Sequence, residues 1–103
     1  MTDTYALIIH EGRHNFLTLG GLAATVGLHP ELVERYVDFG LLEPARFLEG
    51  QPLFGLETVP RLLTIQRLRR DIGIGLSGVA VILDLTDKIR ELQREVEWLR
   101  NRM

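Results

Sequence analysis

Hydrophobic residues recur along the chain at the three- and four-residue spacing of short helices, and glycines separate these stretches. The first predicted helix begins after Thr18, a favourable N-cap, and ends at Gly27. The second begins at Pro30, where the missing N–H of proline costs nothing, and ends at Gly40. His29, just before Pro30, is expected to cap it. The two helices are joined by a short turn and predict a helix-turn-helix.

Strand-forming residues flank this pair of helices. The segment TYALII, Thr4–Ile9, predicts a β-strand, and the segment EGRHN, Glu11–Asn15, predicts a turn after it. Beyond the second helix, the segment ARFLEGQPLFG has apolar pairs on both sides of Glu49–Gln51. This arrangement predicts a small β-hairpin of the kind called a wing.

Two more helices complete the predicted fold. The third runs from about Glu57 to Ile72 and stops at Gly73. Ser77 is then expected to cap a long fourth helix that reaches the C-terminus. Its apolar residues alternate at steps of three and four over about three heptads, which is the a/d pattern of a coiled coil. The residues of this seam are Ile82, Leu85, Ile89, Leu92, Val96, Leu99 and Met103.

The seam has two interpretations. The helix could pack along its own domain, or two copies of the helix could pair in a homodimer. A chain of 103 residues leaves little domain to cover so long a stripe, so the homodimer is favoured, with the seam from Ile82 to Leu99 as the dimer interface. The seam alone does not give the orientation of the two helices. The predicted organisation is mainly α, with a helix-turn-helix domain at 1–75 and a dimerisation helix at 76–103.

Composition narrows the class of protein further. Hydrophobic residues make up 46% and charged residues 25%, which is typical of a folded domain. The absence of cysteine excludes a disulfide framework, a thiolate zinc site and a cysteine nucleophile, and it fits a reducing cytosol. The N-terminus has no signal-peptide pattern, and the longest apolar run, Val79–Leu83, is too short to span a bilayer. We therefore expect a cytoplasmic protein without a membrane partner.

Charge is distributed unevenly along the chain. Residues 1–58 hold three arginines and eight acids, a balance of −5, whereas residues 59–103 hold nine Lys and Arg and six acids, a balance of +3. The acidic half contains the second helix. Its exposed face is expected to carry Glu31, Glu34, Arg35 and Asp38, with Glu43 just beyond its end. A helix with three acids and one base is a poor partner for the polyanion DNA.

The order of strand, helix-turn-helix, wing, helix and terminal coiled coil resembles the MerR superfamily of winged-helix DNA-binding regulators. The segments LGGLAATVGLHPELVERYVDFGLLEP and RLLTIQRLRRDIGIGLSGV carry this resemblance, over about residues 17–80. MerR recognition helices typically have Arg-Tyr-Tyr six residues before Gly-Leu-Leu, and their wings have Tyr-Arg-x-Tyr. Here Glu34 and Pro52 stand at the two arginine positions. Two phosphate contacts are thereby lost, so DNA binding is not expected, although Arg35 and Arg46 remain in these elements.

The C-terminal half, and above all the run GVAVILDLTDKIREL, is similar to the CbpM family of chaperone modulators. That resemblance implies a small dimeric protein without cofactor or catalysis. It also implies binding to the J-domain of a DnaJ-like co-chaperone, CbpA, and inhibition of the work of this co-chaperone with the Hsp70 DnaK. The location implied is the cytoplasm, including the nucleoid where the partner is found there.

The J-domain uses a basic helix to engage Hsp70, and an acidic surface would complement it. The expected charged contacts are Glu31, Glu34, Asp38 and Glu43. An apolar anchor nearby, Phe39 or Leu28, would supply most of the affinity. An alternative contact is the basic end of the third helix, at Arg67, Arg69, Arg70 and Asp71. Two other classes of function stay open: a MerR-type DNA-binding regulator, and a coiled-coil adaptor whose helix-turn-helix is only a packing unit.

Other candidate chemistry is weak. His10 and His14 are four residues apart, but they fall in a strand-turn region that gives them no common helical face, so no metal site is expected. The segment GIGLSG follows no strand and lacks the Lys-Ser pair of a phosphate-binding loop. No enzyme, cofactor or metal is therefore expected.

One carboxylate pair also lies on the fourth helix. Asp84 and Asp87 are expected to lie on an open helix surface without a pocket. There they would be solvated or would pair with Lys88 and Arg90 across the dimer.

Overall fold

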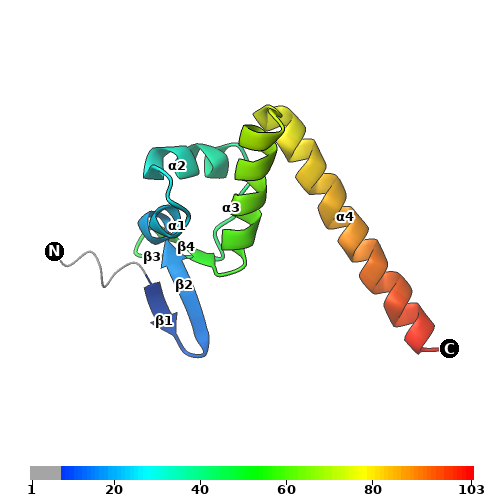
Figure 1. Cartoon of the computed structure of the whole chain (residues 1–103). Coiled ribbons are helices and arrows are strands. Elements are labelled where there is room, and N and C mark those ends of the chain that lie inside the picture. Colours follow the sequence, from blue (N-terminus) through cyan, green and yellow to red (C-terminus); the bar gives the residue numbers. More distant parts are fainter. Residues whose placement is uncertain (1–7) are drawn as a thin grey trace.

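The computed structural model describes residues 8–103, which form a small body of sheet and short helices and a long helix that projects from it (Figure 1). The elements are β1 (Ile8–Glu11), β2 (His14–Thr18), α1 (Leu19–Val26), α2 (Pro30–Asp38), β3 (Arg46–Leu48), β4 (Gln51–Gly55), α3 (Thr58–Gln66), the π-helical turn η2 (Arg67–Asp71) and α4 (Leu76–Asn101). Within the described part the fold is mostly helical, with one small antiparallel sheet.

The sheet has four antiparallel strands in the order β1-β2-β4-β3. The predicted hairpin is present as β3 and β4. Strand β2 was not predicted, because the sequence pattern indicated a turn over Glu11–Asn15. The turn is limited to Gly12 and Arg13, and Leu17 of β2 lies opposite Phe54 of β4, where both side chains are buried. Pairing with β4, which is distant in sequence, makes this segment a strand.

The predicted first strand falls partly within the structure. Ile8 and Ile9 belong to β1, which continues to Glu11. The rest of that prediction, at positions 4–7, lies outside the described residues.

The predicted start signals of the helix-turn-helix are confirmed. The Thr18 hydroxyl accepts a hydrogen bond from the Gly21 N–H at 2.9 Å, which satisfies one of the free donors at the start of α1. His29 Nδ1 accepts from the Glu31 N–H at 3.1 Å and caps α2 in the same way. Pro30 occupies the first helical position of α2.

The end of α2 is a Schellman turn. Gly40 has φ +89°, a conformation that a residue with a Cβ adopts only at a cost. The Gly40 N–H donates to the Val37 carbonyl at 3.0 Å, and the Leu41 N–H donates to the Tyr36 carbonyl at 2.9 Å. Leu41 and Tyr36 are both buried, so the turn directs the chain after α2 into the core.

The hydrophobic core is formed by residues of the sheet, of α1 to α3, of the segment after α2 and of the beginning of α4. Its buried members are Leu17, Leu22, Ala23, Val33, Tyr36, Leu41, Leu42, Phe54, Leu62, Ile65, Val79 and Leu83. Burial of each large apolar side chain stabilises the fold by about 1.5–3 kcal/mol. Because Val79 and Leu83 belong to this cluster, the first turns of α4 are held by the body of the same chain.

The third and fourth helices differ from their predicted forms at the join. The third predicted helix, from about Glu57 to Ile72, is α3 followed by the π-helical turn η2, and the expected glycine stop, Gly73, has φ +80°. The prediction of Ser77 as an N-cap is wrong. Gly75 is the N-cap, with φ −74° and ψ 170°, and Ser77 is the second residue of α4. The extended backbone at Gly75 lets the helix begin directly after it.

Beyond the body, α4 continues alone (Figure 1). We call Lys88–Asn101 the arm, because every residue of it is exposed, and we call the part of the chain from β1 to η2 the body. Seam residues on and next to the arm present apolar side chains to solvent, with Leu85 53% and Leu92 60% exposed. Ile82, the first seam residue, is partly buried beside the body.

Candidate partner-binding surface

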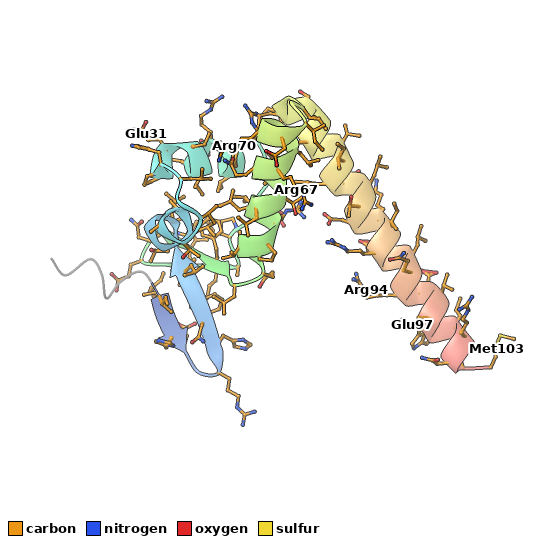
Figure 2. The ribbon with its side chains drawn as sticks, viewed as in Figure 1. Glu31, Arg67, Arg70, Arg94, Glu97 and Met103 are labelled. Atoms are coloured by element: carbon orange, nitrogen blue, oxygen red, sulfur yellow. The ribbon has the colours of Figure 1, made fainter. Side chains whose placement is uncertain are left out.

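Helix α2 separates apolar and acidic residues on opposite faces. Val33 and Tyr36 are buried in the core. Glu31, Glu34 and Asp38 are all exposed, as the sequence predicted, and Figure 2 shows Glu31 projecting from α2 away from the body. The separation follows from the helical repeat, which places residues three and four apart on one face.

The α2 carboxylates have no ion-pair partner within residues 8–103. The ion pairs of that part of the chain join Arg46 to Glu11, Arg61 to Asp87 and Lys88 to Asp84. Arg35, the basic residue of α2, is also exposed. The surface therefore presents carboxylates to solvent whose charge no neighbouring cation neutralises through a direct contact.

The two candidate apolar anchors lie in different environments. Phe39 is the C-cap of α2, directly after Asp38 in sequence, and is 46% exposed. Leu28 is partly buried and packs against the core, so its side chain already has a partner inside the chain. Glu43 is exposed in the segment that follows α2. The structure thus places Phe39 beside Asp38 at the C-terminal end of α2, while Glu31 lies in the first turn of the helix. Leu28 packs inside the chain and is not free to act as an anchor.

The hairpin of β3 and β4 carries Arg46, one of the two arginines that remained as possible DNA-phosphate contacts in the sequence analysis. The Arg46 guanidinium donates to the Glu11 carboxylate across the sheet. Pro52, at the position of the family's wing arginine, is partly buried in β4 opposite Phe47. Arg46 would have to leave Glu11 before it could contact a phosphate, which weakens the case for DNA binding through this hairpin.

The alternative contact at the basic end of the third predicted helix is only partly available to a partner. Arg67 and Arg70 are exposed on η2 (Figure 2), but Arg69 lies with its guanidinium carbon 6.0 Å from the centre of the Tyr36 ring. That distance is within the range of a cation–π contact with a core residue. Asp71 is exposed beside them. One of the three arginines is therefore engaged with the body.

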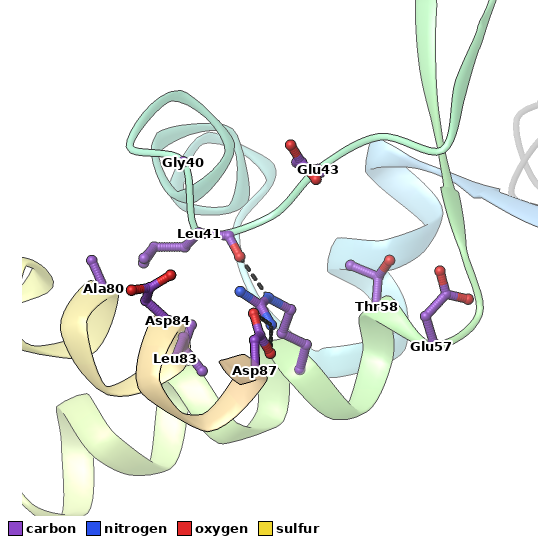
Figure 3. A pocket seen from close by; sticks show the side chains of 10 residues that line it. Gly40, Leu41, Glu43, Glu57, Thr58, Ala80, Leu83, Asp84 and Asp87 are labelled. Carbon is purple, nitrogen blue, oxygen red and sulfur yellow. Dashed lines mark hydrogen bonds and ion pairs between the residues drawn. The ribbon is translucent and has the colours of Figure 1, made fainter. Parts of the chain in front are cut away.

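The expectations for Asp84 and Asp87 need correction. Both residues pair within the chain: Lys88 lies 3.1 Å from Asp84 on the same helix, and Arg61 lies 3.2 Å from Asp87. A pocket is also present, because both aspartates line a cavity of about 440 Å³ between α4 and the segment after α2 (Figure 3). This cavity could not be predicted from the sequence, because its walls come from α3, α4 and the α2–β3 segment, which only the tertiary fold brings together.

Arg61 is the functional candidate that the sequence pattern did not indicate. It sits in the first half of α3 with its side chain one-third exposed, and it reaches both Asp87 and the Leu41 carbonyl. A single arginine near the start of an amphipathic helix gives no sequence signal, since nothing in its spacing shows which groups the fold will place around it.

Two classes of site receive no support from the described residues. Within residues 8–103, no group of three or more His, Asp or Glu side chains could hold a metal ion. None of the helices in that range is both long and apolar enough to cross a membrane.

Comparison with known proteins places the chain in a family. Residues 17–101 match the family described as MerR HTH family regulatory protein, and the chain belongs to this family. Over 67 residues it is also 33% identical to a protein of Streptomyces coelicolor named "Putative heat shock protein HspR". The match covers 65% of this chain and 44% of that protein, so the chain spans less than half the length of this relative.

Proposed function

We propose that this MerR-family protein is a chaperone modulator of the CbpM type. In this role it binds the J-domain of a DnaJ-like co-chaperone such as CbpA and inhibits the co-chaperone's activity with DnaK. The observation that carries the proposal is the acidic face of α2, where Glu31, Glu34 and Asp38 are exposed without an ion-pair partner in residues 8–103. A DNA-reading helix needs the opposite charge on this face.

The proposed contact combines charge with an apolar anchor. The acids of α2 and Glu43 attract the basic helix of the J-domain, which gives specificity and fast association. Phe39, about half exposed at the end of α2, is placed to bury against the partner and supply affinity. The name of the Streptomyces relative, a heat shock protein, supports a role near the chaperone system.

The active form in this proposal is a homodimer through α4. The seam residues of the arm are exposed along its length, and no other segment of the described chain covers them. An apolar stripe of this length is normally buried against a partner. A dimer would present two acidic surfaces, one from each copy.

The alternative is a MerR-type regulator that binds DNA. Family membership favours it, and Arg35, Arg67 and Arg70 are exposed basic residues that could contact phosphates. The charge of α2 counts against it, because each carboxylate facing the duplex repels phosphate where the fold would need attraction.

Calorimetric titration separates the two functions. The purified protein is titrated with the isolated J-domain of the CbpA-like protein from the same organism, and duplex DNA is titrated in parallel. The modulator proposal expects saturable J-domain binding and no heat from DNA. DNA binding that weakens steeply with salt, together with no response to the J-domain, would instead establish the regulator.

A charge-reversal pair then tests the surface. Glu34→Arg with Asp38→Arg is expected to weaken J-domain binding by about tenfold or more, because two attractions become repulsions. The matched control is Glu91→Arg with Glu97→Arg, which reverses two exposed carboxylates on α4 instead of α2. Normal J-domain binding by the α2 variant would eliminate the acidic surface as the contact.

A further inference from the structure

The long helix is attached to the body over a short stretch. Val79 and Leu83 are its buried residues, Asp87 is its last partly buried residue, and every residue from Lys88 onward is exposed. Apolar packing therefore anchors only the first two turns of α4. Beyond these turns, Asp87 is the last residue of α4 that is still partly buried beside the body.

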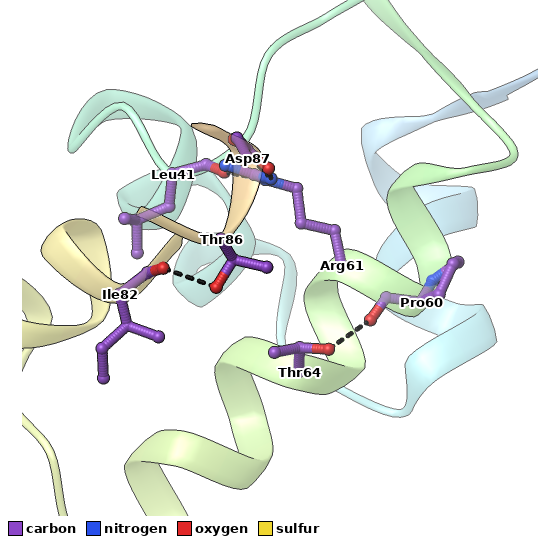
Figure 4. Close-up of polar contacts among 7 residues, drawn as sticks. All are labelled: Leu41, Pro60, Arg61, Thr64, Ile82, Thr86 and Asp87. Carbon is purple, nitrogen blue, oxygen red and sulfur yellow. Dashed lines mark hydrogen bonds and ion pairs between the residues drawn. The ribbon is translucent and has the colours of Figure 1, made fainter. Parts of the chain in front are cut away.

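Arg61 makes the outermost polar contact between body and helix. Its Nε donates to the Leu41 carbonyl at 2.8 Å, and its Nη1 lies 3.2 and 3.3 Å from the two carboxylate oxygens of Asp87 (Figure 4). One guanidinium thus joins three segments: α3, α4 and the chain after α2. A planar guanidinium can hold several acceptors at fixed angles, so this contact constrains direction as well as distance.

Open space flanks this contact on both sides. One cavity of about 440 Å³ lies toward the segment after α2, and another of about 590 Å³ lies between α3 and α4. Arg61 and Asp87 line both cavities, together with Glu57 and Leu83. Open cavities, and not packed side chains, therefore surround this contact. We call the contacts of Arg61 with Asp87 and with the Leu41 carbonyl the strut.

We propose that Arg61 is a positioning residue that sets the angle between the arm and the body, and that it couples this angle to the segment after α2. Leu41 directly follows Gly40, the turn that ends α2, and Glu43 lies two residues further. A movement of that segment displaces the Leu41 carbonyl, which shifts the Arg61 guanidinium and with it the contact to Asp87. The orientation of the arm then responds to events at the end of α2, whichever partner causes them.

Distance measurement between the body and the arm tests the strut. The chain has no cysteine, so Glu31→Cys and Glu97→Cys give two unique spin-label sites, one on α2 and one near the end of α4 (Figure 2). Labelled protein is diluted with an excess of unlabelled protein, so that the measured distances lie within one chain even in a dimer. The intact strut is expected to give a single narrow distribution.

Two variants remove the strut without touching the buried core. Asp87→Asn removes the charge that Arg61 binds on α4, and Arg61→Gln removes both of its contacts. Each is expected to broaden the distance distribution and shift its mean, while the circular dichroism spectrum stays unchanged. If Arg61→Gln does not fold, Asp87→Asn alone still decides the question.

The matched control is Asp84→Asn. Asp84 is a carboxylate one turn earlier on α4, lines the same 440 Å³ cavity, and pairs with Lys88 on its own helix. Its loss is expected to leave the distribution narrow. The proposal is overturned if Asp87→Asn gives the same distribution as Asp84→Asn, since packing of Val79 and Leu83 would then suffice to direct the arm.

Discussion

Tyr36 and its neighbours show how single positions on one helix take different roles. Tyr36 is 1% exposed, and its hydroxyl donates to the Gln66 Oε1 at 2.8 Å, which ties α2 to the end of α3. Glu34, two residues earlier, is exposed on the acidic face. In this chain the tyrosine of the MerR-like motif belongs to the core, and the surface of α2 is left to the charged residues around it.

Removing the Tyr36 hydroxyl tests this assignment. Tyr36→Phe leaves the partly buried Gln66 oxygen without its donor, so the free energy of unfolding is expected to fall by about 1 kcal/mol in urea denaturation. Binding to a partner on α2 is expected to be unchanged, because the ring stays in the core.

A double-mutant cycle supplies the control for the hydroxyl. Once Gln66→Ala has removed the acceptor, adding Tyr36→Phe is expected to cost little more. Equal losses in the presence and absence of Gln66 would show that the hydroxyl does not act through this bond.

At the scale of elements, α4 has one apolar face that packs against the body and a second apolar stripe, the seam, that is mostly exposed. Its first turns pack with the body through Val79 and Leu83, on a face different from the seam, so intramolecular packing leaves most of the seam uncovered. The heptad pattern and the exposure of Leu85 and Leu92 therefore describe the same apolar stripe from sequence and from structure.

An aspartate in the middle of the seam tests the proposed dimer. Leu92→Asp places a charge where two helices would bury their leucines, and it is expected to convert the dimer to a monomer in sedimentation analysis. Arg94→Asp is the matched control, because it introduces the same residue on the arm away from the seam. A dimer that survives Leu92→Asp would place the interface elsewhere.

At the scale of the whole molecule, charge is segregated. Within the described residues, positions 8–58 hold seven acids and three arginines, in the sheet, the helix-turn-helix and the turns around them, and the basic balance of residues 59–103 lies in α3, η2 and α4. In the proposed function, this distribution of charge would steer a basic partner toward α2.

Ionic strength tests this steering. The association rate with the J-domain is expected to fall by about tenfold between about 50 mM and about 500 mM salt, since screening shortens the range of the attraction. Stopped-flow fluorescence measures the rate, and the Glu34→Arg, Asp38→Arg variant should show a weaker salt dependence. A rate independent of salt would rule out electrostatic steering of this partner.

Local signals in the sequence determined much of the fold. Thr18, His29 and Pro30 start helices through capping and backbone chemistry that acts within a few residues. Gly27 and Gly40 end them because positive φ favours glycine. The acidic face of α2 also followed from the sequence, because helical periodicity fixes which side chains share a face.

Only the tertiary structure decided the features that depend on distant segments. Strand β2 exists because β4, more than thirty residues away, pairs with it. Helix α4 begins at Leu76, after Gly75 rather than Ser77, and the Leu76 side chain packs against the core. Arg61 meets Asp87 and the Leu41 carbonyl because three elements converge, and no periodicity along one segment encodes such a meeting. Sequence alone fixed what each segment can form, and packing between segments fixed which groups came into contact.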